Sequence, residues 1–226
     1  MQPGFTVKLF NPMRSLMSEG TKDFRKLFPT GYIPIILTNI FLAGETLRKK
    51  TPNEIENKLT RRLGAKMNQL PEFRNGPFSL HLQQELPPSD PDSDSPEGYV
   101  DILISCGYGS ETYFAIEAKR LRVRSVKGKM DAGNDDYVNK GMMRFVSGQY
   151  APFMTTGAML GYVYDGDLQK ACSGVDRYIK GKIKELRLLP PEKMKRSSLF
   201  ATKGIFETRH YLTKRKFCIY HLFLGV

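Results

Sequence analysis

The spacing of apolar residues along the chain changes between helical and strand-like patterns, which predicts a mixed α/β protein. An apolar run with a proline near its start predicts a buried helix over residues 33–47. A second helix over 55–67 has an apolar residue at every fourth position, and we expect Thr51 or Asn53 to cap its N-terminus.

Strand-like runs follow these helices. Two connections between strands are marked by turn residues, a Pro- and Asp-rich loop over 87–96 and a glycine-containing turn over 107–110. In chain order we expect three strands (78–86, 99–104 and 113–119), a basic flexible segment (120–129), a helix (135–150, capped by Asn134 or Asp135), a strand (155–164), a helix (168–186) and a hairpin (205–212 with 217–224). A mixed central β-sheet flanked by helices is the simplest way to bury this order, with the last helix and the β-hairpin added at the C-terminal end.

Charge suggests the kind of partner. The chain has 226 residues, with 35 Lys plus Arg against 23 Asp plus Glu, so its formal net charge is +12. A balance this basic favours a polyanion, above all nucleic acid. The cysteines are three in number, far apart and without zinc-ligand spacing, which is typical of a reducing compartment. With no secretory leader and no apolar run long enough to cross a bilayer, we expect a cytoplasmic protein without a membrane partner.

Two acidic groups inside apolar strands are the candidate chemistry. Asp101 lies in one predicted strand, and Glu117-Ala118-Lys119 ends the next. Charges are costly to bury without a partner, and strand alternation places Glu117 and Lys119 on one face. If the two strands are antiparallel neighbours, Asp101 faces the same spot, and two carboxylates with an ammonium can hold a divalent cation and orient a water. The alternative is a surface hairpin with a solvated Glu–Lys pair, typically worth under about 1 kcal/mol.

This order of elements, with Asp101 on the second strand and Glu117-Ala118-Lys119 on the third, resembles the PD-(D/E)XK nuclease superfamily, which has the restriction-endonuclease-like αβββαβ core. The resemblance covers about residues 50–165 of what we expect to be a single domain spanning 1–226. An N-terminal arm (1–28) and a C-terminal elaboration (166–226) lie outside it. Val100 stands where the family pattern nominally has proline.

The resemblance implies roles for individual residues. Asp101 and Glu117 would be the metal ligands, the backbone carbonyl of Ala118 would complete the protein's share of the shell, and the cation would be Mg²⁺, with Mn²⁺ as a substitute. Lys119 would position the attacking water or help to deprotonate it. The family often adds a carboxylate from the helix before the first strand. Glu54 and Glu56 are both candidates, and we prefer Glu56 because it borders the apolar stripe.

Other polar residues are weaker candidates. Glu85 either points into the same cleft or is an ordinary edge-strand charge. His81, His210 and His221 are scattered and more typical of local packing than of a metal site, although Arg209-His210 could touch nucleic acid. The candidate nucleic-acid contacts, each with a bland basic surface or a helix cap as its alternative, are Arg120, Arg122, Arg124, Lys140, Arg144 and Gln149.

We therefore expect a metal-dependent nuclease, most simply a DNA endonuclease of a prokaryotic or phage-related restriction or defence system. It would act alone, as a homodimer, or as the nuclease subunit of a complex with a protein partner or activator. The alternatives are a catalytically inactive nucleic-acid-binding protein on the same fold and a regulatory interaction module.

Overall fold

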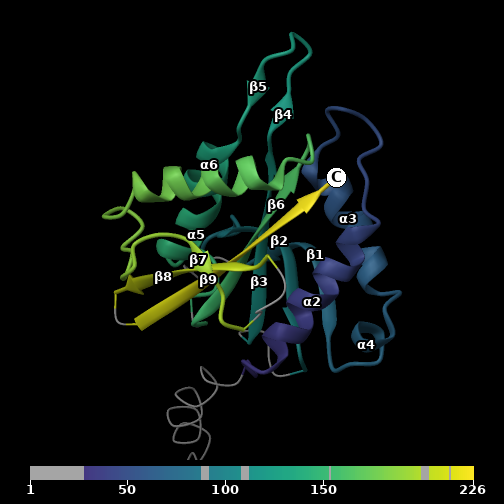
Figure 1. Cartoon of the computed structure of the whole chain (residues 1–226). Coiled ribbons are helices and arrows are strands. Elements are labelled where there is room, and N and C mark those ends of the chain that lie inside the picture. The colour runs from purple at the N-terminus through teal and green to yellow at the C-terminus, as the bar shows by residue number, and fades with distance from the viewer. Residues whose placement is uncertain (1–27, 88–91, 108–111, 153, 200–203, 214) are drawn as a thin grey trace, which may run out of the picture.

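A mixed β-sheet forms the centre of the molecule (Figure 1). The computed structural model describes residues 28–87, 92–107, 112–152, 154–199, 204–213 and 215–226. Within these residues, seven strands pair in the order β1-β2-β3-β6-β9-β8-β7, and two short strands, β4 and β5, form a separate hairpin. The strands are β1 (Ser79–Leu86), β2 (Gly98–Ser105), β3 (Tyr113–Leu121), β4 (Val123–Arg124), β5 (Met130–Asp131), β6 (Thr156–Val163), β7 (Lys195–Arg196), β8 (Phe206–Leu212) and β9 (Arg215–Gly225).

Strand direction explains the connections. β1, β2 and β3 form an antiparallel meander, β6 pairs parallel to β3, and β9 pairs parallel to β6. Parallel neighbours need a crossover connection, and the helical segment between β3 and β6 supplies one. Most residues of β6 and β9 are buried, as expected for strands at the centre of a covered sheet.

Helices cover both faces of the sheet (Figure 1). They are α2 (Tyr32–Glu45), α3 (Glu56–Met67), α4 (Pro71–Arg74), the π-helix η1 (Asp136–Met142), α5 (Met143–Val146) and α6 (Leu168–Lys180). On one face, Thr60 of α3 is hydrogen-bonded to the hydroxyl of Tyr162 on β6. On the other, Tyr137 of η1 is hydrogen-bonded to His221 of β9, and Asn139 donates to Tyr178 of α6. The result is a three-layer α/β/α arrangement, so the expected mixed sheet flanked by helices is confirmed.

Most predicted elements are present, but helix ends differ. The caps predicted at Thr51 or Asn53 are wrong: Ile55 occupies the N-cap position of α3, in an extended conformation. The helix predicted over 135–150 is π-helical at first and ends at Val146, and neither Asn134 nor Asp135 caps it through its side chain. The helix predicted to reach residue 186 ends at Lys180, with Gly181 at its C-cap.

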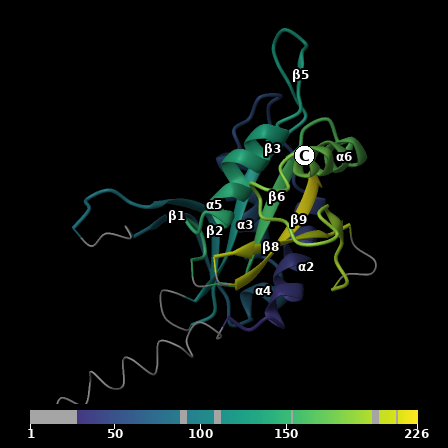
Figure 2. The same cartoon turned by 90° about the vertical axis from the view of Figure 1, so that its left-hand side faces the viewer.

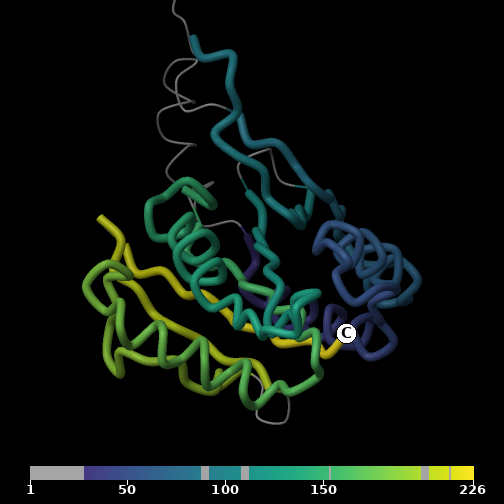
Figure 3. The backbone as a smooth tube through the Cα atoms, turned by 90° about the horizontal axis from the view of Figure 1, so that it is seen from above, coloured from purple at the N-terminus to yellow at the C-terminus, as the bar shows by residue number. Residues whose placement is uncertain are grey.

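Sheet elements also differ from expectation. The segment predicted to be flexible over 120–129 includes β4 and the turn before β5, and the resulting hairpin projects from the body of the molecule (Figures 1 and 2). The C-terminal hairpin forms as predicted, and its second strand, β9, pairs with β6 and so extends the central sheet. Helix α4 and strand β7 were not predicted; each is too short to leave a periodic pattern. The β1–β2 ribbon extends to one side, which is clearest from above (Figure 3).

Three sequence expectations fall partly or wholly outside the described residues: the arm over 1–28, the loop over 87–96 and the turn over 107–110. No helix in the described ranges is both long and apolar enough to traverse a lipid bilayer.

Candidate active site

The predicted acidic pair lies where β2 and β3 separate. Their regular antiparallel pairing runs from Ser105–Tyr113 to Ile102–Ile116, and one step further the register sets Asp101 opposite Glu117. Ala118 N–H then donates 2.8 Å to the Asp101 carboxylate (Oδ2) instead of to a main-chain carbonyl of β2. The expected antiparallel arrangement is confirmed, and Asp101 and Glu117 share a face of the sheet.

Both carboxylate oxygens of Asp101 accept hydrogen bonds. Besides the Ala118 amide, it accepts a 2.8 Å hydrogen bond on Oδ1 from Gln83 Nε2 on β1, the cross-strand neighbour on its other side. Gln83 has a positive φ of 52°, a conformation rarely adopted outside glycine. Sequence reasoning missed Gln83, although it precedes Glu85 by two positions and therefore shares its strand face. Glu85 itself is exposed on the edge strand opposite Tyr99.

Glu117 is the most deeply buried carboxylate of the site, with 1% of its surface exposed. Its Oε1 accepts hydrogen bonds from Lys119 Nζ at 2.6 Å and from Arg144 Nη1 at 2.9 Å. Its Oε2 is buried and has no hydrogen-bond partner among the described residues. Burial and, to a smaller extent, the nearby charge of Asp101 raise the pKa of Glu117 to about 8, although Lys119 and Arg144 oppose the shift.

Lys119 links three chain segments. Its ammonium donates to Glu117 Oε1 and, at 3.0 Å, to the carbonyl of Ala118. It also lies 3.9 Å from Glu56 Oε1, at the first turn of α3. Burial raises the pKa of Glu56, with a smaller rise from Asp101 and an opposing effect of Lys119. The structure thus brings together all four predicted catalytic residues.

The choice between the two helix carboxylates is resolved by their partners. Glu54 accepts hydrogen bonds from both terminal nitrogens of Arg62, at 2.8 and 2.7 Å, and from the backbone amide of Lys50. The hydrogen bond from Arg62 lowers the pKa of Glu54 to about 2, although burial opposes this. Glu54 is therefore committed to a structural ion pair, and Glu56 is the carboxylate that faces Lys119.

A cavity of about 240 Å³ opens beside these groups; we call it the carboxylate cavity. It lies against the neck of the β4–β5 hairpin, the residues 120–123 and 131–134. Its lining mixes cations and carboxylates, as a site for a charged ligand requires. The lining residues are Glu56, Lys119, Arg120, Val123, Asp131, Gly133, Asp136, Lys140 and Arg144.

The predicted nucleic-acid contacts separate into two groups. Arg120, Lys140 and Arg144 line the carboxylate cavity, although Lys140 is also paired with Asp136 at 2.7 Å. Arg124 is exposed on the hairpin and donates to the carbonyl of Gly128.

The other two predicted contacts have intramolecular partners. Arg122 forms a two-pronged ion pair with Asp165, from Nε to Oδ1 at 2.9 Å and from Nη2 to Oδ2 at 2.5 Å, outside the carboxylate cavity. Gln149 Nε2 donates at 2.6 Å to the carbonyl of Glu97, next to β2. Both side chains therefore have structural partners that sequence spacing does not reveal.

Arg144 and Tyr150 tie the end of the helical crossover to the acidic strands. Arg144 Nη1 contacts the Tyr150 hydroxyl as well as Glu117, and that hydroxyl donates to the carbonyl of Tyr99 on β2. The carbonyls of Glu97 and Tyr99 are thus satisfied by side chains where β3 no longer pairs with β2. Arg144 was predicted as a phosphate contact, and it lies within the carboxylate site itself.

The histidines lie away from this site. His81 is exposed on β1, 3.4 Å from Ser105. His210 and His221 are fully buried and joined through Thr208, whose hydroxyl lies 2.7 Å from one ring and 2.9 Å from the other. Burial lowers the pKa of His210 to about 4 and of His221 to about 3. The suggested contact of His210 with nucleic acid is therefore wrong, because its ring is inaccessible.

Among the described residues, no group of three or more His, Cys, Asp or Glu side chains is arranged to hold a metal ion. Any cation here would therefore rely on two carboxylates, a main-chain carbonyl and water. Comparison with known proteins gives no matching family model, no matching curated protein and no matching solved structure.

Proposed function

We propose that this protein is a metal-dependent nuclease with a restriction-endonuclease-like core, which hydrolyses phosphodiester bonds in DNA. The observation that carries the proposal is the convergence of Asp101, Glu117 and Lys119 at the point where β2 and β3 separate, beside a cavity lined by both basic and acidic residues. Buried groups of this kind are costly to maintain, which favours a functional role over a structural one.

The order of elements supports the same proposal. Helix α3, the meander β1-β2-β3, the crossover through η1 and α5, and the parallel strand β6 follow the αβββαβ order of the resemblance. Glu56 approaches the site from the helix that precedes the first strand of the meander, as that resemblance implies.

The donor atoms fit a hard divalent cation. Asp101, Glu117 and the Ala118 carbonyl are all oxygen donors, and Glu117 Oε2 is buried without a partner among the described residues. Mg²⁺ prefers oxygen ligands and keeps several waters, so two carboxylates and a carbonyl suffice on the protein side. When bound, the cation would supply Lewis-acid stabilisation of the charge that develops on the phosphate.

The chain's own residues supply the remaining functions. An ammonium has three N–H donors, and Lys119 uses two of them on Glu117 Oε1 and the Ala118 carbonyl. The third is available to a water or a phosphate oxygen in the cavity that Lys119 lines. Arg144 adds a second positive charge beside Glu117, which orients that carboxylate and offsets its charge.

The biological setting in our proposal, a prokaryotic or phage-related restriction or defence system, rests on the resemblance alone, whereas the net charge of +12 supports a nucleic-acid partner. A protein partner, an activator or a second copy is part of that proposal.

Two observations favour a second candidate function, a nucleic-acid-binding protein without catalysis. Glu117 Oε1 is already paired with two cations, and the described residues hold no cluster of three potential metal-binding side chains.

Cleavage assays test the proposal and separate it from this alternative. Purified protein is incubated with plasmid, single-stranded DNA and RNA in Mg²⁺, Mn²⁺ or EDTA, beside Asp101→Asn and Lys119→Ala. Asparagine keeps an oxygen for the Ala118 amide, so Asp101→Asn should fold. Exposed matched controls are Glu85→Gln and Lys58→Ala.

We expect metal-dependent cleavage of DNA that falls at least about a hundredfold in both site variants and in neither control. Cleavage that survives both substitutions would refute the site. Nucleic-acid binding in EDTA without cleavage under any condition would support the second candidate function.

A further inference from the structure

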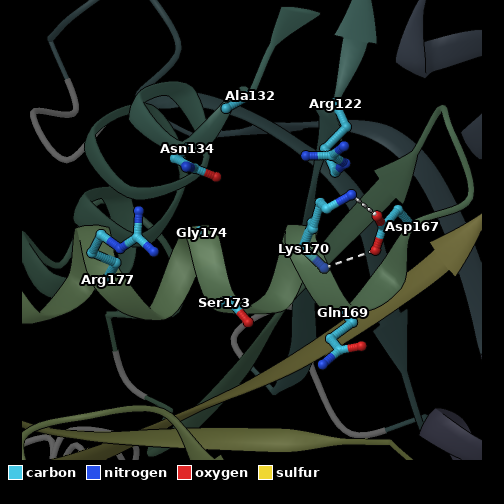
Figure 4. Close-up of a pocket in the computed structure, with 9 residues that line it drawn as sticks. All are labelled: Arg122, Ala132, Asn134, Asp167, Gln169, Lys170, Ser173, Gly174 and Arg177. Carbon is cyan, nitrogen blue, oxygen red and sulfur yellow. Dashed lines mark hydrogen bonds and ion pairs between the residues drawn. The ribbon is translucent and has the colours of Figure 1, made fainter.

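A second cavity lies on the other side of the hairpin neck. Its volume is about 640 Å³, and one side is formed by helix α6 (Figure 4). We call it the α6 groove. Asp131 and Gly133 line the carboxylate cavity, whereas Ala132 and Asn134 line the groove. Neighbouring residues of the same chain segment thus face the two cavities alternately, so the cavities are separated by little more than the thickness of this segment.

The wall contributed by α6 is a single helical stripe. Ser173, Gly174 and Arg177 follow Lys170 by three, four and seven residues, so all four lie on one face of the helix. The side chains of Lys170 and Arg177 rise from the helix towards Arg122 and Asn134 (Figure 4). Gly174 lets the Asn134 amide approach the helix closely, because a Cβ at this position would lie 2.9 Å from that amide and the Asn134 side chain would have to shift.

Charge and hydrogen-bonding capacity in the groove favour an anion. Its lining has three cations, Arg122, Lys170 and Arg177, and one carboxylate, Asp167. Arg122 and Lys170 are partly neutralised by ion pairs with Asp165 and Asp167. The side chain of Arg177 forms no ion pair or hydrogen bond with any described residue. The same is true of the side chains of Asn134, Gln169 and Ser173.

The identity of the lining residues narrows the ligand class. None of the described lining side chains is aromatic, so the groove offers no surface on which a nucleobase could stack. Arginine, lysine, serine and amide side chains are the groups that contact phosphate oxygens. The N-terminus of α6 does not supply the site, because the Asp167 side chain already accepts from the Lys170 amide there.

We propose that the α6 groove binds the phosphodiester backbone of DNA beside the segment held at the carboxylate cavity, with Arg177 as the principal phosphate contact. This inference rests on the proposed nuclease function. A backbone contact beyond the hairpin neck would orient the polyanion without reading its sequence, and the projecting hairpin would lie between the two contacts.

Salt-dependent binding tests the assignment directly. A fluorescently labelled 20-base-pair duplex is titrated with the full chain carrying Asp101→Asn, in EDTA, by fluorescence anisotropy at several salt concentrations. On this background we compare Arg177→Gln, Lys170→Gln and the matched control Lys180→Gln. Lys180 lies on the same helix, but it is paired with Asp176 and does not line the groove.

Each phosphate contact contributes about 0.9 to the slope of log K against log salt, which corresponds to about an eightfold change in affinity at 0.1 M salt. We expect Arg177→Gln to lower the slope by about that amount and to weaken binding about eightfold, with a smaller effect of Lys170→Gln. Lys180→Gln removes the same charge and should leave the slope unchanged. Thermal melting of each variant checks that the fold is intact.

The possible outcomes separate this inference from the proposed function. If Arg177→Gln behaves like Lys180→Gln while the wild-type chain still cleaves DNA, the groove assignment is overturned and the nuclease function stands. If the wild-type chain neither binds nor cleaves DNA, both fail. If Arg177→Gln leaves DNA binding intact but abolishes binding to vesicles of anionic phospholipid, the groove serves a lipid headgroup and the DNA assignment is overturned.

Discussion

Glu117 should destabilise the metal-free protein at neutral pH, and Glu117→Gln should relieve that cost. The pKa of this carboxyl is raised by burial from its ordinary value of 4.5 to about 8. Between these two values the unfolded chain has released the proton and the folded chain still binds it. The folded state therefore binds more protons, and the free energy of unfolding falls as pH rises through this window.

The size of the effect follows from the shift. Each pH unit is worth about 1.4 kcal/mol for one proton, and pH 7 lies about 2.5 units above the ordinary pKa of the carboxyl. The cost at pH 7 is therefore about 3 kcal/mol. Glutamine keeps an oxygen to accept from Lys119 and Arg144 and does not titrate, so Glu117→Gln should raise the free energy of unfolding by about that amount.

Urea unfolding in EDTA measures the difference in the free energy of unfolding between wild type and Glu117→Gln, at pH 7 and again at pH 4.5. At pH 4.5 the wild-type carboxyl is largely protonated in the folded state, and the difference between wild type and variant should nearly vanish. Glu85→Gln removes an exposed carboxylate of the edge strand β1 and should change stability by less than about 0.5 kcal/mol at either pH. An equal gain for Glu117→Gln at both pH values, or a loss at pH 7, would refute the reasoning.

Three further outcomes are expected. Arg144→Met should lower the cleavage rate at least about tenfold and raise the pKa of Glu117 further, because it removes a cation beside that carboxyl; the second effect is measured as an alkaline shift of the pH–rate profile. Rescue by Arg144→Lys would support a positioning role for Arg144, and an unshifted profile would contradict it. Gly133→Ala should lower the free energy of unfolding in urea by about 1–3 kcal/mol, because a Cβ at residue 133 would lie 2.2 Å from the Arg120 carbonyl. Gly128→Ala should cost less, because a Cβ at residue 128 would be in open space, and equal costs would contradict the steric argument. Stability should fall by about 1.4 kcal/mol per pH unit for each of His210 and His221 as pH drops below about 6.5, since only the unfolded chain binds those protons. His221→Gln should reduce that slope, and an unchanged slope would contradict the reasoning.

Much of the fold could be read from sequence because its periodic patterns are strong. The helix over 55–67 and the strands carrying Asp101 and Glu117 are long enough for burial to impose a repeat. Elements decided by tertiary contacts could not be read in this way. The crossover ends at Val146 because the chain then turns at Gly148, which has a φ of 86°, and Gln149 and Tyr150 bond to carbonyls at β2.

In the candidate site, too, local sequence patterns predict some of the residues, whereas tertiary contacts place the others. Asp101, Glu117 and Lys119 follow from strand alternation, because neighbouring strands in register must share a face. Arg144 was named, but its contact with Glu117 depends on how a π-helix packs over the sheet, which has no local sequence signal. Gln83 was missed because a glutamine in an edge strand is usually an ordinary solvent-exposed polar residue. Arg122 was expected to be free because Asp165, its partner, lies 43 positions away.

Two buried glutamates among the described residues, Glu54 and Glu117, have pKa values that are shifted in opposite directions. Glu54 has a two-pronged ion pair with Arg62 and a backbone donor, and these partners lower its pKa to about 2 despite burial, so the pair stabilises the fold. Glu117 has two cationic partners as well, yet its pKa rises to about 8, because burial and Asp101 outweigh them.

Strongly shifted pKa values of buried carboxyls cluster at functional sites, so this imbalance favours a functional role for Glu117 over a purely structural one. Backbone strain lies in the same region: Gln83, which holds Asp101, and Arg122, at the hairpin neck, both have positive φ, and a π-helix covers the face. A divalent cation beside Glu117 would favour the ionised form of this carboxyl and lower its pKa, so cation binding would offset the cost of burial, which supports our proposal that Asp101 and Glu117 bind one.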